Sequence, residues 1–319
     1  MPFSADKPWI FPTAVAWDGT SLPEWCSFAQ VTCGTDILEP DYAHVIQLNF
    51  YRHNFAGSLP SSISAFSYIE QFDLGNNRLT GSLPPTIGTW ERILVLSVEG
   101  NSLTGTIPEC ITSFKNLQVL WAQNNHIHGT LPSNFNLLTD LGAIDLSDNL
   151  ISGTLPSSIG NLSRLQYLFL PNNQLVGTIP STINSLSAMN ILILKNNKLT
   201  GTIPATRTEY AAVTNIDLSM NMLTGTIPDS YMLSSLQTLD LHHNFLTGTI
   251  PQLVSSLTLC TILQLEDNLL TMGSVSAIPE GYFSNTTSSG SLRLGNNCLS
   301  YKSVRHPWQS TKGNNCKRE

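Results

Sequence analysis

One repeated pattern constrains the fold of this chain more than any other feature. From Leu48 onward the motif L-x-L-x-x-N-x-L-x-G-x-[IL]-P recurs, and the steps between successive Asn positions are 24 residues seven times, then 23, 24 and 29 residues. Nine consecutive copies keep both the Gly four residues after the Asn position and the Pro seven residues after it. The length of 319 residues alone would suggest two globular domains, but self-similarity at a fixed period predicts a stack of structural repeats. The Asn position, occupied by His in the first copy, lies at His53, Asn77, Asn101, Asn125, Asn149, Asn173, Asn197, Asn221, Asn244, Asn268 and Asn297.

The residue types within one copy predict its local structure. Two apolar residues flank a polar one in the L-x-L segment, as at Phe72 and Leu74, which indicates a short strand with one buried face. The following Asn can bond backbone groups of adjacent coils, so we expect a stacked ladder of Asn side chains. An apolar pair spaced by three, such as Ile87 and Trp90, follows each Pro and suits a short 3₁₀ turn. Because one coil cannot bury its own apolar face, the coils must stack into a continuous core.

The motif LxxLxLxxNxLxGxIPxxIxxL resembles the plant-type leucine-rich repeat of receptor-like kinase ectodomains and polygalacturonase-inhibiting proteins. Related repeats also occur in surface antigens of kinetoplastid and other protists. The resemblance implies an α/β repeat solenoid: a right-handed superhelix of about ten 24-residue repeats plus caps, with a parallel β-sheet on its concave face. A second short sheet is expected near the G-x-[IL]-P segments. The expected domains are an N-terminal cap at 1–44, the solenoid at 45–299 with an insertion at about 272–290, and a C-terminal cap or tail at 300–319.

The cysteines extend this resemblance to the caps. The segment from Trp25 to Cys33 resembles the W-C-x-W-x-G-V-x-C piece of the family's N-terminal cap, although Phe28 and Gln30 replace its second Trp and its Gly. Terminal placement favours two disulfides, Cys26–Cys33 and Cys298–Cys316, and therefore an oxidising compartment. The alternative is that all six cysteines are reduced in a cytosolic protein. We expect Cys110 and Cys260 to be buried free thiols, and the absence of a C-x-x-C pair argues against structural zinc.

Composition and short motifs further limit the partners and the cellular location that the sequence predicts. Charged residues make up only 12% of the chain and the net charge is −7, so a nucleic-acid partner is not expected. No apolar run approaches the length of a membrane span, so any membrane association would come from segments absent from this chain. The sequons at Asn161 and Asn285 are candidates for glycosylation in a secretory route. The first residues, MPFSADKPW, do not resemble a signal peptide, so an extracellular or cell-surface location requires a leader outside this chain.

No catalytic constellation is recognisable, and neither an enzyme activity nor a metal or cofactor is expected. The phosphate-binding, dinucleotide, zinc-protease, nucleophile-elbow and EF-hand motifs are all missing. A column of acidic residues at the middle of the L-x-L segments could resemble the paired acids of glycosidases. Aspartate is common at this point of plant-type repeats, however, so we interpret the column as structural. The column consists of Asp73, Asp145, Asp217 and Asp240.

Large aromatic residues mark a candidate binding surface on the concave face. Positions six, four, two and one residue before each ladder residue should project into solvent, and most are small or polar. Exposed aromatics there have no core to fill and are typical anchors for proteins or stacking surfaces for sugars. The sequence therefore predicts non-covalent binding of a protein, peptide or polysaccharide ligand, without identifying it. A structural surface or cell-wall protein and an ectodomain fragment of a receptor-like kinase are the alternatives. The candidate ligand-binding residues are Trp121, Tyr167, Phe169, Asp145, Asp148, Gln123 and Lys195.

Overall fold

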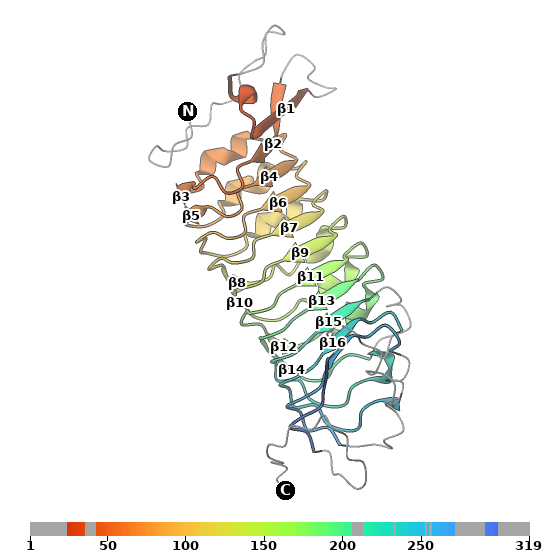
Figure 1. Ribbon diagram of the computed structural model, residues 1–319. Helices are drawn as coiled ribbons and strands as arrows, with labels where there is room; N and C mark the ends of the chain where they lie inside the picture. Colours follow the sequence, from red (N-terminus) through yellow and green to blue (C-terminus); the bar gives the residue numbers. More distant parts are fainter. Residues whose placement is uncertain are drawn as a thin grey trace. The chain divides into compact units, whose positions relative to one another are not determined.

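The computed structural model describes residues 24–35, 43–205, 213–231, 234–252, 254, 257–271 and 291–298. The chain divides into two compact units, Met1–Ser152 and Gly153–Glu319. Each unit is a stack of coils in which a strand of a main sheet recurs once per coil (Figure 1). The predicted insertion at about 272–290 and the tail at 300–319 lie outside the described residues. The structure therefore confirms the leucine-rich repeat solenoid within each unit.

The main sheet of the first unit begins with an antiparallel pair and continues with parallel strands. Val31 pairs with Leu48 in the antiparallel pair, and Trp121 pairs with Asp145 in the parallel part. Residues paired across neighbouring parallel strands here are 24 apart, which is the sequence period. The strands, in sheet order, are β1 (Val31–Thr35), β2 (Ala43–Asn49), β4 (Gln71–Asp73), β6 (Val95–Ser97), β7 (Val119–Trp121) and β9 (Ala143–Asp145).

The main sheet of the second unit is parallel throughout. Phe169 pairs with Ile193, and Ile193 in turn with Asp217. The step shortens to 23 residues between Asp217 and Asp240, as the sequence spacing predicts. The strands, in sheet order, are β11 (Tyr167–Phe169), β13 (Ile191–Ile193), β15 (Asn215–Asp217), β16 (Thr238–Asp240), β17 (Ile262–Gln264) and β18 (Ser291–Arg293).

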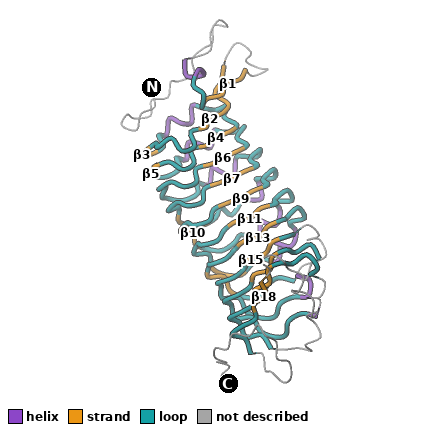
Figure 2. The backbone as a smooth tube through the Cα atoms, viewed as in Figure 1, coloured by secondary structure: helices purple, strands orange, loops and turns teal. Residues whose placement is uncertain are grey.

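Three short secondary sheets form near the repeated Gly within the described residues, as expected from the resemblance. Parallel pairs join β3 (Ala56–Ser58) to β5 (Arg78–Thr80), β8 (His128–Thr130) to β10 (Leu150–Ser152), and β12 (Val176–Thr178) to β14 (Lys198–Thr200). From Pro60 to Pro180 the apolar pairs after the repeated Pro form the predicted 3₁₀ turns, which alternate with the strands along the chain (Figure 2). The 3₁₀ helices are η1 (Glu24–Ser27), η2 (Ser61–Ala65), η3 (Pro85–Thr89), η4 (Glu109–Ser113), η5 (Phe135–Leu137), η6 (Ser157–Asn161), η7 (Ser181–Ser185) and η8 (Asp229–Tyr231).

The ladder asparagines join neighbouring coils from inside the core. Asn101 is representative: its Nδ2 donates to the carbonyl of Leu74 in the preceding coil at 3.0 Å, and its Oδ1 accepts the N–H of Leu79 at 2.9 Å. Its Nδ2 also donates to the Val98 carbonyl of its own coil at 3.0 Å. Because one amide satisfies backbone groups on two coils, the turns can be buried without orphan polar groups. The first ladder position differs, since His53 is exposed and its Nδ1 contacts the Tyr51 carbonyl of its own coil at 2.8 Å.

The residue directly before each ladder position lies in the left-handed region. Asn and Asp tolerate this backbone best after Gly, and they occupy most of these sites. Met220 has a φ of 55° there and gains no local hydrogen bond in exchange.

We expect Met220→Asn to stabilise the second unit by about 0.5–1 kcal/mol, because Asn lowers the cost of the left-handed backbone. The midpoint of urea unfolding measures this change. Met222→Asn is the matched control, because Met222 is 41% exposed, like Met220 at 40%, but has no positive φ. Equal shifts in the two variants would contradict the backbone explanation.

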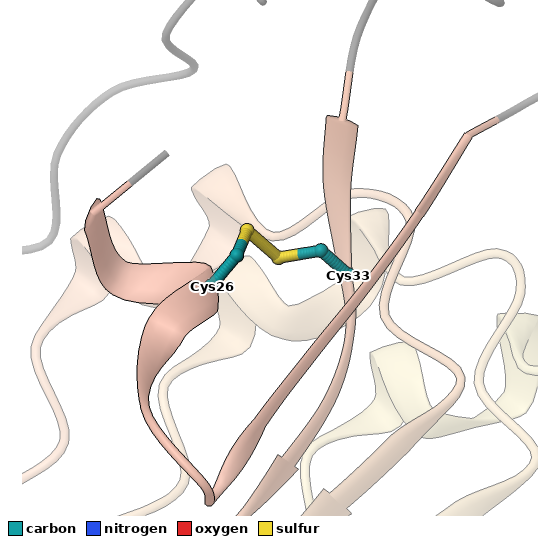
Figure 3. The surroundings of a disulfide bond; sticks show 2 residues. All are labelled: Cys26 and Cys33. Atoms are coloured by element: carbon teal, nitrogen blue, oxygen red, sulfur yellow. A yellow bond between two sulfur atoms is a disulfide. The ribbon is translucent and has the colours of Figure 1, made fainter. Parts of the chain in front are cut away.

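The described cysteines agree with the predicted redox pattern. Cys26 of η1 is bridged to Cys33 of β1, which fastens the first 3₁₀ helix to the first strand (Figure 3). Cys298 is disulfide-bonded, and its predicted partner Cys316 lies outside the described residues. Cys110 and Cys260 are free thiols, but only Cys260 is buried while Cys110 is half-buried. None of the described helices is long and apolar enough to span a membrane.

Candidate functional site

The solvent-facing side of the main sheet, here called the strand face, is where the coils differ most. Alternation along each strand separates it from the core: Trp121 is 41% exposed, whereas its neighbours Leu120 and Ala122 are buried. The core-facing residues repeat from coil to coil because packing requires them. The strand face has no such constraint, so its side chains vary.

In the first unit the strand face centres on Trp121. It lies between Ser97 and Asp145, its partners on the two neighbouring strands. Gln123 is half-buried, and its buried Oε1 has no hydrogen-bond partner within the described residues. Asp148 is exposed and has a φ of 53°. Because Asp tolerates this left-handed backbone, the residue can be explained by the turn as well as by ligand binding.

The acidic column is built into the turns that follow the strands. The Oδ1 atom of each Asp accepts the backbone N–H two residues later, as in Ser147 to Asp145 at 3.0 Å and Ser219 to Asp217 at 3.0 Å. Burial raises the pKa of Asp145 and of Asp217 above the usual range, and hydrogen bonds from the following Ser oppose this rise. These bonds support the structural interpretation of the column, because each carboxylate closes an Asx turn.

In the second unit the strand face carries an apolar patch formed by Tyr167, Phe169, Ile191 and Ile193. The rings of Tyr167 and Phe169 are nearly parallel, with centroids 6.3 Å apart and planes inclined by 10°. Register places Ile191 beside Tyr167 and Ile193 beside Phe169. All four side chains are half-buried, so Tyr167 and Phe169 are less exposed than Trp121 of the first unit.

The two isoleucines were missed by sequence reasoning, although a signal was present. The run Ile191-Leu192-Ile193 places apolar residues on both faces of a strand, and only the middle one is needed for the core. A search for apolar residues at solvent-facing strand positions would therefore have identified both isoleucines.

Charged side chains follow the apolar patch along the second unit. The Nζ atom of Lys195 lies 4.0 Å from Oδ2 of Asp217, and Asp217 pairs in register with Asp240. The described residues contain no group of three or more His, Cys, Asp and Glu side chains arranged to hold a metal ion. This end of the strand face thus offers ion pairs next to an apolar surface.

The predicted ligand-binding residues fall in both units. Trp121, Gln123, Asp145 and Asp148 belong to the first unit, and Tyr167, Phe169 and Lys195 to the second. That the two groups form one patch stays a prediction. Of the predicted glycosylation sites, Asn161 is exposed at the end of η6, and Asn285 lies outside the described residues.

Comparisons with known proteins agree with this geometry. The family described as Leucine Rich Repeat matches residues 68–90, 116–138, 141–162, 164–186 and 235–257. A search of curated proteins found no match. Among solved structures, PEPR1 in complex with AtPEP1 is 29% identical with a TM-score of 0.69, over 86% of this chain and 41% of that chain. The Arabidopsis receptor kinase HAESA ectodomain, in complex with an IDA peptide hormone ligand, is also 29% identical, with a TM-score of 0.64 over 86% of this chain and 49% of that chain.

A plant ice-binding protein has the same fold, with a TM-score of 0.67 and 21% identity over 88% of this chain and 87% of that chain. At this identity the likeness concerns the fold alone. The chain spans less than half the length of the two receptor ectodomains. Its repeated motif, its sheets and these neighbours show that the chain contains leucine-rich repeats, which are similar to the plant-type repeats of receptor-kinase ectodomains.

Proposed function

We propose that this chain is a non-catalytic recognition module that binds a peptide or protein segment on its strand face, outside the cell or at its surface. The apolar patch of the second unit carries this proposal. Four large side chains gather there at positions where core packing does not require them. Apolar and aromatic clusters of this kind are typical binding anchors.

The scaffold suits this role because its anchors are already ordered. Tyr167 and Phe169 stack on each other, and each is partly covered by its strand neighbours. Side chains held in this way lose little further rotamer entropy when a ligand binds. The sheet beneath them is held by the ladder, in which Asn197 bonds to Leu170 of the preceding coil at 2.9 Å.

Further observations support a peptide ligand and an extracellular location for this chain. The HAESA ectodomain binds a peptide hormone, and this chain has comparable repeats over part of that length. The Cys26–Cys33 bridge and the bonded Cys298 favour an oxidising compartment. The Asx turns account for the acidic column without catalysis, since each turn takes up one oxygen of its carboxylate.

The test is to select peptides from a random display library on the intact chain and then measure their dissociation constants with single variants. For peptides bound to the second unit, Phe169→Ala should weaken binding by about 2 kcal/mol, roughly thirtyfold, because it removes an anchor. For peptides bound to the first unit, Trp121→Ala should do the same.

Phe245→Ala provides the matched control in the second unit. Phe245 is 53% exposed but directly follows a ladder residue, so it lies off the strand face. Its removal should leave binding unchanged. Selected peptides that are insensitive to Trp121→Ala and Phe169→Ala but lost with Phe245→Ala would show that the strand face is not the binding surface.

A further inference from the structure

Two histidines form a cluster with carboxylates at one end of the second unit's strand face. We call it the His–carboxylate cluster: Lys195, Asp217, Asp240, His242, His243, Glu266, Asp267 and Arg293. His242 Nδ1 lies 2.5 Å from Asp240 Oδ1, and His243 Nδ1 lies 3.1 Å from Asp267 Oδ2. The two imidazole rings meet edge to face with centroids 5.0 Å apart. Each histidine therefore has its own carboxylate, and the two rings are in contact.

These contacts determine where each imidazole carries its proton. An ionised carboxylate only accepts hydrogen bonds, so the Nδ1 atoms of His242 and His243 must be the donors. In the neutral ring Nε2 is then a bare acceptor, and it is the atom that takes up the second proton. The carboxylate partner stabilises the resulting imidazolium ion, so uptake of a proton costs no hydrogen bond.

Proton uptake changes the charge of the whole cluster. With neutral histidines, two basic residues, Lys195 and Arg293, face four acidic ones, which leaves a formal charge of 2 − 4 = −2. With both histidines protonated the sum is 4 − 4 = 0.

The negative charge of the cluster is only partly compensated by its neighbours. Asp217 uses Oδ1 for the turn and has Lys195 only at 4.0 Å from Oδ2. Oε2 of Glu266 is buried and makes no contact with solvent, but no group in the described part of the chain donates a hydrogen bond to it, and Arg293 approaches only Oε1, at 3.8 Å, so this carboxylate adds uncompensated negative charge to the cluster. The apolar patch adjoins this region, since Ile193 pairs with Asp217. A ligand with alternating apolar and basic side chains would match both surfaces.

We propose that the second unit binds a basic peptide segment at neutral pH and releases it on acidification, with His242 and His243 as the sensors. This inference rests on the proposed function, because it assigns a ligand class and a regulation to the same strand face. Protonation removes the net negative charge that attracts the basic side chains and places two cations beside them. Histidine is the side chain whose charge changes in this pH range.

The probe is an acetylated, amidated peptide of alternating leucine and arginine, with its glutamate counterpart as the charge control. Binding to the full chain is measured by fluorescence anisotropy at about pH 7.5 and about pH 5.5. The wild type should bind the basic peptide about tenfold more weakly at the lower pH, because the attraction of two net charges is lost.

The sensors are tested with the double variant His242→Gln, His243→Gln, since Gln keeps hydrogen-bonding groups but takes up no proton. Whatever its affinity at neutral pH, this variant should bind the basic peptide equally well at the two pH values. The matched control is His126→Gln, His128→Gln, whose exposed histidines lie off the strand face in the first unit. This variant should retain the pH dependence, and circular dichroism should show that both variants are folded.

Three outcomes would overturn the inference. The first is unchanged pH dependence in the His242, His243 variant, which would assign the effect to groups such as Asp217. The second is tighter binding of the glutamate peptide than of the arginine peptide at neutral pH. The third is no binding of the basic peptide while library-selected peptides still bind the strand face, which leaves the proposed function intact. If neither kind of peptide binds, the proposed function fails as well.

Discussion

Replacing Asn197 by Ala should destabilise the second unit by about 3 kcal/mol or more, because it leaves several buried backbone groups without partners. Asn197 is only 8% exposed. Its Nδ2 donates to the carbonyls of Leu170, Leu194 and Lys195 at 2.9, 3.0 and 3.2 Å, and its Oδ1 accepts the N–H of Leu175 at 3.0 Å. Alanine can replace none of these bonds. Urea unfolding followed by far-ultraviolet circular dichroism measures the loss.

The neighbouring residue provides the control for this prediction. Asn196 also bonds the preceding coil, from its Nδ2 to Asn172 at 2.8 Å, but it is exposed and its φ is 52°. Asn196→Gly removes the amide and keeps the left-handed backbone, so its effect should stay within about 1 kcal/mol. Similar losses of unfolding free energy in the two variants would mean that burial does not determine how much the hydrogen bonds of Asn197 stabilise the unit.

Trp90→Ala should destabilise the first unit by about 3–5 kcal/mol through the cavity that it leaves. Trp90 is fully buried, its ring lies 4.8 Å from that of Phe72, and its Nε1 donates to the Ile63 carbonyl at 3.3 Å. The residue joins one coil to the coil before it, so the change disturbs the stack itself. The melting temperature should fall on the order of 10 °C, measured by differential scanning calorimetry.

Trp121→Ala is the control for Trp90→Ala, because it removes a Trp from the strand face and not from the core. Trp121 is 41% exposed on the strand face of the same unit, so Trp121→Ala should change the free energy of unfolding by less than about 1 kcal/mol. A loss as large as that of Trp90→Ala would assign Trp121 to the core and remove it from the candidate binding residues.

The spacing of residue types was enough to predict the coil. Leu74 and Leu79 are buried, Asn101 bridges them, and Ile87 and Trp90 close a 3₁₀ turn, as their positions within the period predict. This success has a simple cause. Equivalent positions in every coil pack into the core in the same way, so the same residue type recurs at the same place in each repeat.

The strand face could be predicted only in part. Trp121, Tyr167 and Phe169 were recognisable because large aromatics are rare at these positions. The pairing of Tyr167 with Ile191 was not predicted, because it depends on which residues of two neighbouring strands, 24 positions apart in the sequence, lie side by side. The Cys26–Cys33 bridge, by contrast, was predicted from a cap resemblance and is present.

By itself the sequence determined the repeat, the ladder and the buried face of each strand, because these depend on a periodic pattern of residue types, whereas the bridge between Cys26 and Cys33 followed from the cap resemblance. Only the tertiary structure decided that Ile191 and Ile193 join the aromatics, and that His242 and His243 each face a carboxylate. Such pairings arise when coils stack in one register. The physical reason is that they depend on the distances between side chains of successive strands and turns, which the order of residues within a single coil does not contain.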